Sequence, residues 1–344
     1  MAISSEQSAV TVGSGKFRYE VAERWERLPA GWSFVEAVGV ASDSRDRVYV
    51  FNRGEHPIIV FDRDGRFLAS WGEGTFRRPH GIYIGPDDAL YLSDDHDHTV
   101  RKFTTEGKLL LVLGTSGRPS DTGVVNNDYR TIRRAGPPFN LPTNLALSRE
   151  GEMYVTDGYG NARVHKFSAD GRLLLSWGEP GTGRGQFQLP HGIAVDREGL
   201  VYVADRENSR VQIFDSRGEF VSEWTDVARP CDIFIDGHDN VYVAELGFRA
   251  GLFPGATAPG PEPVGGRVSV FGRDGKPLVR WGGGVNPCAA GDFFAPHDIW
   301  ADSHGDVYVG EVTMSAGGNR GLVPADCHTL QKFVRTGAVG ADSA

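Results

Sequence analysis

The sequence predicts an all-β protein folded as a six-bladed β-propeller. Three observations indicate this fold: short Val, Ile, Tyr and Phe runs separated by glycines are frequent, helical periodicity is almost absent, and one pattern of about 40 residues occurs six times. Four antiparallel strands in a unit of this length are typical of a propeller blade. A chain of 344 residues is therefore expected to form one large repeat domain.

Most repeats consist of a strand, an acidic-Gly turn, a strand that ends in an acid, a strand that ends in Phe, a second turn and a final strand. They run at 34–76, 77–115, 139–187, 188–227, 228–294 and 295–335. The sixth has no good fourth strand, whereas the orphan segment 17–28 resembles the final strand of the others. We expect the orphan segment to complete the last blade, because this closes the ring and removes an exposed strand edge.

The domain organisation follows from this assignment. Residues 1–16 are expected to be a disordered leader, 17–335 the propeller and 336–344 a C-terminal tail. Three insertions interrupt the repeat period, at 116–138, 247–266 and 313–327. Long loops on a rigid scaffold usually cover a functional site or an interface.

The bulk properties exclude several partners. A formal net charge of −9 argues against non-specific binding to nucleic acid or to an anionic membrane. No apolar run approaches the roughly 18 residues that span a bilayer. The polar N-terminus lacks a signal-peptide core, so cytoplasmic residence is expected. Of the three cysteines, Cys288 and Cys327 lie in loop-like stretches and could pair in an oxidising compartment, but free thiols are favoured.

Three histidines occupy one position of the repeat in alternate copies. His80, His191 and His297 belong to repeats two, four and six, each in a Pro-His motif, while Val38, Thr143 and Cys231 stand at the aligned position of the other repeats. Equivalent positions of innermost strands form a ring around a propeller axis. The histidines should therefore converge from three directions about 120° apart, an estimate from the six-fold ring.

Three imidazoles with one open position are typical of a catalytic zinc site. Zinc is the preferred ion because imidazole ligands suit it, and iron or copper fits nearly as well. His96 and His98 are grouped with aspartates but fall where a strand turns outward, so a solvated loop is expected there.

A second group of residues follows the second strand of the repeats and does not recur. Arg53, Tyr159 and Arg206 differ from the repeat pattern at positions that can reach over the proposed metal. Guanidinium groups beside a phenol favour its ionised form, which makes Tyr159 a candidate general base. Arginines also bind carboxylates well, so a substrate carboxylate is expected.

These residues resemble a known family. The repeats resemble NHL repeats, and the following motifs resemble the lyase domain of peptidylglycine α-amidating monooxygenase: Asn52-Arg53-Gly54-Glu55-His56, Pro79-His80-Gly81, Asp157-Gly158-Tyr159-Gly160-Asn161, Leu189-Pro190-His191, Ala204-Asp205-Arg206-Glu207-Asn208 and Pro296-His297-Asp298. The resemblance covers roughly residues 34–335 and includes the non-recurrent positions.

The resemblance implies a reaction and an assignment of roles. The family cleaves a peptidyl-α-hydroxyglycine, which is a carbinolamide, into a peptide amide and glyoxylate. It implies zinc on the three histidines, Tyr159 as the base for the substrate hydroxyl, and Arg53 and Arg206 as the groups that bind the substrate and its carboxylate. It also implies a structural calcium held by the carbonyls of Val40 and Ile82 and by the carboxylate of Asp298, a ligand set that suits a hard cation.

The chain departs from the family in its loops and in its cysteines, of which one is informative about the site. Animal members have a disulfide cysteine directly after the catalytic tyrosine, where this chain has Gly160. The peptide substrate is therefore open, and a small α-hydroxy amide is an alternative to a peptide. Two other functions are weighed against a carbon–nitrogen lyase: a metal-dependent hydrolase or lactonase, and a non-catalytic protein-interaction propeller. The sequence does not determine the oligomeric state.

Overall fold

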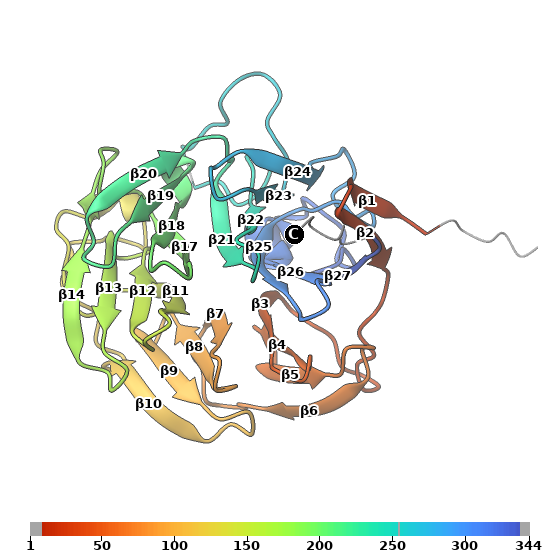
Figure 1. The fold of residues 1–344 in the computed structure, drawn as a ribbon, viewed down its shortest axis with the longest axis horizontal. Helices are drawn as coiled ribbons and strands as arrows, with labels where there is room; N and C mark the ends of the chain where they lie inside the picture. Colours follow the sequence, from red (N-terminus) through yellow and green to blue (C-terminus); the bar gives the residue numbers. More distant parts are fainter. Residues whose placement is uncertain (1–8, 254, 338–344) are drawn as a thin grey trace, which may run out of the picture.

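The computed structural model describes residues 9–253 and 255–337 and contains six four- or five-stranded antiparallel sheets arranged around one axis (Figure 1). The innermost strands are β3 (Ala37–Ser42), β7 (Pro79–Ile84), β11 (Pro142–Leu147), β17 (Pro190–Val195), β21 (Pro230–Ile235) and β25 (Pro296–Ala301). The second strands are β4 (Val48–Asn52), β8 (Leu90–Asp94), β12 (Met153–Asp157), β18 (Val201–Asp205), β22 (Val241–Glu245) and β26 (Val307–Glu311). The prediction of a six-bladed propeller is confirmed.

The third strands are β5 (Ile58–Phe61), β9 (Thr99–Phe103), β13 (Arg163–Phe167), β19 (Arg210–Phe214), β23 (Arg267–Phe271) and β27 (Leu330–Arg335). The outer strands of blades one to five are β6 (Phe67–Trp71), β10 (Leu109–Gly114), β14 (Leu173–Trp177), β20 (Phe220–Trp224) and β24 (Pro277–Gly282). Inner and second strands are buried on both faces, whereas the outer strands are partly exposed. The core therefore lies between neighbouring blades, where the apolar residues of facing sheets meet.

The N-terminal segment completes the sixth blade, as the sequence predicts. Strand β2 (Phe17–Ala22) pairs antiparallel with β27, with Tyr19 opposite Arg335, and Figure 1 shows these two ends of the chain side by side. The prediction of a leader that is disordered through residue 16 is wrong in one part, because β1 (Thr11–Ser14) pairs with β2 as a fifth strand. Residues 1–8 and 338–344 lie outside the described residues, as does most of the predicted tail.

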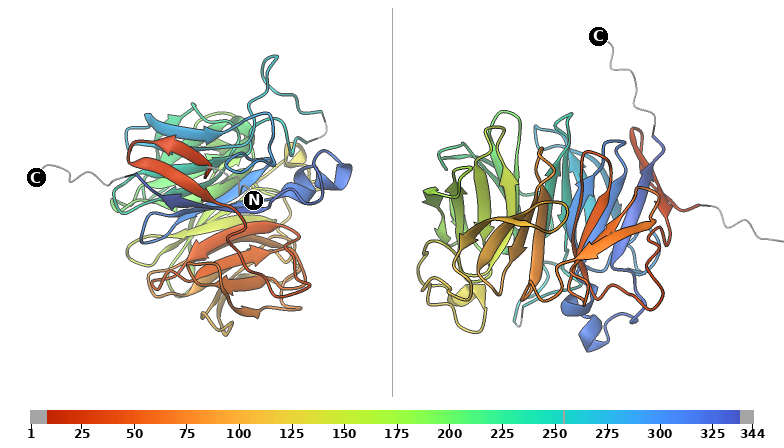
Figure 2. Two further views of the ribbon diagram at one scale, coloured as in Figure 1. Left: turned by 90° about the vertical axis from the view of Figure 1, so that its right-hand side faces the viewer. Right: turned by 90° about the horizontal axis from the view of Figure 1, so that it is seen from below.

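The three insertions lie on one face of the propeller (Figure 2). They contain little regular structure: the 3-10 turns η1 (Tyr129–Thr131) and η3 (Gly318–Arg320) and the one-turn helix α1 (Thr313–Ala316). The remaining short elements are β15 (Glu179–Pro180), β16 (Gln186–Phe187) and η2 (Arg206–Asn208). The insertions contact one another, since the rings of Tyr129 and Phe253 meet edge to face at 5.0 Å and the amide of Gly251 donates to the carbonyl of Ala316 at 3.0 Å.

A disulfide joins Cys288 to Cys327, so the expectation of free thiols at these positions is wrong. The bond connects the loop before β25 to the insertion after β26, two segments that the fold of the sixth blade brings together. Their proximity is a tertiary property that neither local sequence shows. Cys231 remains a free, buried thiol. No helix among the described residues is long and apolar enough to cross a membrane.

Candidate metal centre

A β-bulge interrupts the pairing of every inner strand with its neighbour at the repeat position that holds the histidines. A bulge turns one side chain out of the regular alternation of a strand. In β7, β17 and β25 the residues at the bulge are His80, His191 and His297. Their side chains converge on the axis because the same irregularity recurs in each blade.

The three imidazoles form one compact cluster. One ring nitrogen from each lies within 4.8 Å of the others, and the ring centroids of each pair are 4.7 or 4.8 Å apart. The exposed fractions of His80, His191 and His297 are 1, 2 and 3%. The predicted convergence of these residues is therefore confirmed.

The other ring nitrogen of each histidine bonds a carbonyl of the next blade. The Nδ1 atoms of His80, His191 and His297 lie 2.8, 2.8 and 2.7 Å from carbonyl oxygens. The acceptors belong to the aligned residues of the intervening blades: Thr143, Cys231 and Val38. A carbonyl only accepts, so Nδ1 carries the proton and Nε2 presents its lone pair to the axis. This arrangement is typical of histidines that ligate a metal.

Burial lowers the pKa of all three histidines well below the usual value, and nearby arginines or histidines lower it further. The imidazoles are therefore neutral at neutral pH, the form that binds metals. The Nε2 atom of His297 is buried and has no hydrogen-bond partner among the described residues. Three neutral nitrogens, one of them unpaired, fit a transition metal such as zinc.

The glycines of the Pro-His-Gly motifs allow this geometry. A Cβ on Gly81 would lie 2.5 Å from the carbonyl oxygen of Thr143, and a Cβ on Gly192 would lie 2.5 Å from that of Cys231. These oxygens are the acceptors of His80 and His191. A larger residue would push the neighbouring strand away and break the bond that orients the imidazole.

Tyr159 places its hydroxyl beside the imidazoles. Its oxygen lies 3.2 Å from Nε2 of His191 and 3.4 Å from Nε2 of His80. The loop that carries it needs small residues on both sides, because a Cβ on Gly158 would lie 2.0 Å from the carbonyl oxygen of Pro190 and one on Gly160 would lie 2.3 Å from Oδ1 of Asn140. This contact explains why a side chain is not tolerated after the tyrosine here.

The two predicted arginines lie at the same rim. Nη1 of Arg206 donates to the hydroxyl of Tyr159 at 3.2 Å, and its guanidinium lies 5.3 Å from the ring centroid. Burial opposes the charge of Arg206, but Tyr159 and Glu207 raise its pKa above the ordinary range. Arg53 donates to the carbonyl of Pro79 and to Glu36, both at 2.9 Å, while its Nη2 is buried and has no hydrogen-bond partner within residues 9–253 and 255–337.

Two of the predicted calcium ligands, Val40 and Asp298, contact each other. The amide of Val40 donates to Oδ1 of Asp298 at 3.0 Å. A second carboxylate, which sequence reasoning did not select, accompanies it: Asp232 accepts from Asn144 at 2.7 Å and from the amide of Ile299 at 3.3 Å. Asp232 and Asn144 line a cavity of about 70 Å³ together with Ile82.

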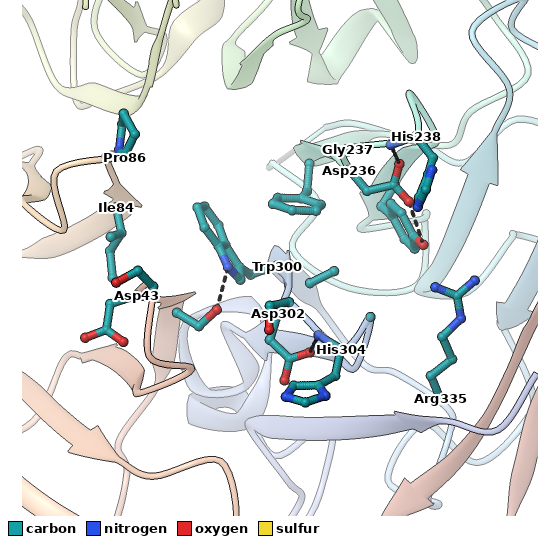
Figure 3. A pocket seen from close by; sticks show the side chains of 18 of the residues that line it. Asp43, Ile84, Pro86, Asp236, Gly237, His238, Trp300, Asp302, His304 and Arg335 are labelled. Atoms are coloured by element: carbon teal, nitrogen blue, oxygen red, sulfur yellow. Dashed lines mark hydrogen bonds between the residues drawn. The ribbon is translucent and has the colours of Figure 1, made fainter. Parts of the chain in front are cut away.

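Trp300 and Phe234 line this small cavity as well. Their ring centroids are 4.9 Å apart, and both residues also line a cavity of about 540 Å³, whose labelled residues include Trp300, Asp43 and Asp302 (Figure 3). Three of its aspartates accept backbone amides within their own turns: Asp43 from Arg45, Asp236 from His238 and Asp302 from His304. The three acids of this larger cavity therefore stabilise turns, whereas His80, His191 and His297 lie toward the face that carries the insertions.

Sequence reasoning missed five charged residues at the rim: Glu36, Arg78, Asp95, Glu207 and Arg229. Two features of the sequence point to some of these residues. An Arg-Pro pair precedes two inner strands, and Asp95 follows its second strand at the position that Arg53 and Arg206 occupy in their repeats. His96 and His98 do not join the trio, which is the one cluster of histidines, cysteines and acids in the described part of the chain that could hold a metal ion.

The chain is similar to several known proteins. The NHL-repeat family model matches residues 76–103 and 187–214. The chain is 36% identical over 234 residues to NHL repeat-containing protein 3 of Mus musculus, covering 61% of this chain and 64% of that protein. It is 30% identical over 340 residues to peptidyl-glycine alpha-amidating monooxygenase of Mus musculus, covering 87% of this chain and 31% of that protein.

A third relative is peptidyl-alpha-hydroxyglycine alpha-amidating lyase 1 of Drosophila melanogaster, with 34% identity over 199 residues, 53% of this chain and 34% of the relative. The chain thus spans less than two thirds of the length of these relatives. The NHL repeats, the six-bladed fold and the similarity to amidating enzymes all indicate the same kind of propeller. The protein is an NHL-repeat β-propeller that resembles the lyase domain of peptidylglycine α-amidating monooxygenase.

Proposed function

We propose that this propeller is a metal-dependent carbon–nitrogen lyase that cleaves an α-hydroxyglycine-type carbinolamide into an amide and glyoxylate. One observation carries the proposal: the hydroxyl of Tyr159 lies 3.2 and 3.4 Å from the Nε2 atoms of two metal-ligating candidates and accepts a hydrogen bond from Arg206. A candidate base, a cation and a candidate metal position thus lie together, with the imidazoles buried and Tyr159 partly buried. A protein-interaction propeller needs no such arrangement.

The residues of the chain divide the work of the reaction. Tyr159 in its ionised form takes the proton of the substrate hydroxyl. The carbonyl π bond of glyoxylate forms as the carbon–nitrogen bond breaks, the electron pair of that bond moves to nitrogen, and the nitrogen is protonated to give the amide. The protonated Tyr159 is the nearby group that returns the proton, so the net change is one proton moved from oxygen to nitrogen.

The unpaired Nη2 of Arg53 would donate to the substrate carboxylate in a charge-assisted hydrogen bond. His80, His191 and His297 would hold the catalytic metal, for which zinc is the first choice. When bound, a zinc ion supplies Lewis acidity at the substrate oxygen. Calcium at the Val40, Ile82 and Asp298 positions is the second metal of the proposal, and its role is structural.

A combined metal and activity experiment tests the proposal. We expect one zinc per chain by elemental analysis and glyoxylate release from an α-hydroxyglycine amide. Tyr159→Phe should keep the metal and lower kcat by about 10²-fold or more, the usual contribution of a general base. His191→Ala should lose the metal, whereas His238→Ala at an exposed turn is the matched control and should keep it.

The outcomes separate the alternatives. Metal binding without glyoxylate release from the wild-type protein would overturn the lyase reaction and keep the metal site. Full metal content in His191→Ala would overturn the three-histidine site itself.

A further inference from the structure

A cavity of about 770 Å³ lies between the insertion at 116–138 and the connection from β14 to β17. The described residues that line it include none of those placed at the histidine site. They do include four arginines and one acid, Glu179, which accepts a hydrogen bond from Gln186 at 2.9 Å. The whole chain has 45 acidic and 36 basic side chains, so this cavity reverses the charge balance of the molecule.

One of the four, Arg163 of β13, lacks the ion pair that its equivalents form in the next two blades. In blade four, Arg210 bonds Asp205, the acid opposite it at the end of the second strand, at 2.8 Å. In blade five, Arg267 bonds Glu245 in the same register, also at 2.8 Å. The arginine at this repeat position therefore normally stabilises its own blade.

In blade three the corresponding acid is taken by other groups. Arg163 stands opposite Asp157, but Asp157 accepts from Nδ2 of Asn161 at 2.8 Å and contacts Nε2 of His165 at 3.4 Å. The guanidinium of Arg163 donates to the carbonyl of Ser176 at 3.3 Å, and its Nε is buried without a hydrogen-bond partner in the described part of the chain. Arg163 thus lines the cavity with a donor that the blade does not use.

Two further arginines of the cavity lack a carboxylate partner. Arg133 of the insertion and Arg184 of the connection are exposed, and neither forms an ion pair with any residue that the structure describes. Arg184 lies over the ring of Phe220 at 5.2 Å from its centroid. The fourth, Arg134, pairs with Asp121. Three of the four positive charges are therefore left without a counter-charge.

We propose that this cavity is a binding site for a small, multiply charged oxyanion such as a phosphate group or a dicarboxylate. Guanidinium groups recognise both through charge-assisted, frequently paired hydrogen bonds. The anion joins Arg133 of the insertion to Arg163 of blade three and to Arg184 of the connection into blade four. The site is separate from the proposed lyase reaction and does not depend on it.

An anion at this position also fixes the insertion that supports the loop of Tyr159. Nδ2 of Asn161 donates to the carbonyl of Gly136, and the amide of Gly136 donates to Oδ1 of Asn161 at 3.3 Å. A ligand that binds only the folded protein stabilises it by mass action. Phosphate or succinate should therefore raise Tm as its concentration passes Kd.

Isothermal titration calorimetry of the full chain with inorganic phosphate and, separately, with succinate tests the proposal. Potassium chloride keeps the ionic strength constant, because salt screens exposed charges. We expect saturable binding of at least one probe. Tighter binding of phosphate identifies the ligand as a phosphate compound, and tighter binding of succinate identifies it as a dicarboxylate.

Variants locate the bound anion. Arg163→Gln should weaken Kd about tenfold or more, because it removes a charge-assisted hydrogen bond from a partly buried group. Arg133→Gln, at an exposed position where folding is not affected, should weaken it about threefold. Arg149→Gln is the matched control, since Arg149 is an exposed arginine of the same blade that does not line the cavity.

The control should bind the probes as the wild type does. The absence of saturable binding of both probes would overturn the proposal. So would an unchanged Kd in both Arg163→Gln and Arg133→Gln, because the anion would then bind elsewhere, or an equal loss in Arg149→Gln, because the effect would then be one of overall charge.

Discussion

One repeat position has two roles in this molecule. In three blades it supplies an imidazole, and in the other three it supplies the carbonyl that orients the imidazole next to it. Any residue type can offer a carbonyl, which explains why the intervening residues Val38, Thr143 and Cys231 are chemically unrelated. The alternation of histidines is visible in the sequence, but the function of the positions between them is visible only in the structure.

At the residue scale, the pair Asp232 and Asp298 should make the stability of the metal-free protein depend on pH. Burial raises the pKa of both carboxyls, and the charge of Asp232 raises that of Asp298 further. A carboxyl with a raised folded-state pKa contributes stability that is complete below its unfolded value, 3.8 here, and is lost as pH rises through the folded value. The metal-free protein should therefore become less stable as pH rises above 3.8 and through about 7, the value to which burial raises the pKa of Asp232.

Thermal melting with and without calcium measures this effect. Calcium should raise Tm more at pH 8 than at pH 5, since the cation compensates the ionised pair. Asp298→Asn should reduce both the pH dependence and the calcium effect, while Glu150→Gln, at an exposed position, should reduce neither. Equal calcium effects at both pH values would contradict a site built on these two carboxylates.

At the scale of single elements, the insertions are tied to the rim rather than free above it. The helix α1 bonds Glu36 through the amide of Ser315, and the insertion at 116–138 bonds the tyrosine loop through Thr122 and Gly160. Asn140 adds a bond to the carbonyl of Ser120 at 2.9 Å. These contacts hold Tyr159 and Arg53 in place from outside the blades, so the insertions contribute to the geometry of the site.

The disulfide should stabilise one of these insertions. It closes a segment of 39 residues, for which chain entropy gives a contribution of up to about 4 kcal/mol to the free energy of unfolding. Cys288→Ser should therefore lower Tm.

Thiol titration checks the pairing in the denatured protein. One thiol per chain should react without reductant, from Cys231, and all three cysteines should react after reduction. In Cys288→Ser, two thiols should react without reductant. Three reactive thiols in protein taken directly from the cell would contradict the pairing and would support the expected cytoplasmic residence, because disulfides are rare in reducing compartments.

At the scale of the whole molecule, the ring depends on its N-terminal strand. The apolar side chains of β2 alternate with exposed ones, and Phe17, Tyr19 and Val21 face the core between blades five and six. Tyr19 is fully buried and packs on Trp281 with ring centroids 5.3 Å apart. The strand thus closes the ring through side-chain packing as well as through its hydrogen bonds to β27.

Tyr19→Ala should destabilise the propeller by about 3 kcal/mol or more, because it removes a large buried aromatic side chain. Glu20→Ala, at an exposed position of the same strand, should change stability by less than about 0.5 kcal/mol. Chemical denaturation of both variants measures the difference. Equal stabilities would show that the strand contributes little to closure.

Much of the fold and part of the site follow from the sequence. The repeat period predicts the six blades, since each unit must bury both faces of its inner strands against neighbours. The spacing of His80, His191 and His297 within the repeats predicts their convergence. Arg53, Tyr159 and Arg206 are recognisable because they depart from the repeat pattern. The prediction of free thiols fails because loop contacts are not periodic.

The sequence by itself determined the number of blades, the strand that closes the ring and the residues that face the axis, because a repeated pattern of burial repeats in space. Tertiary structure decided the rest: the pairing of Cys288 with Cys327, the second buried carboxylate Asp232, and the charged residues at the rim of the histidine site, which include Arg78 and Asp95. These features depend on contacts between blades and insertions that no local pattern encodes. Charge and hydrogen bonding act between residues distant in the chain, and only the folded ring brings them together.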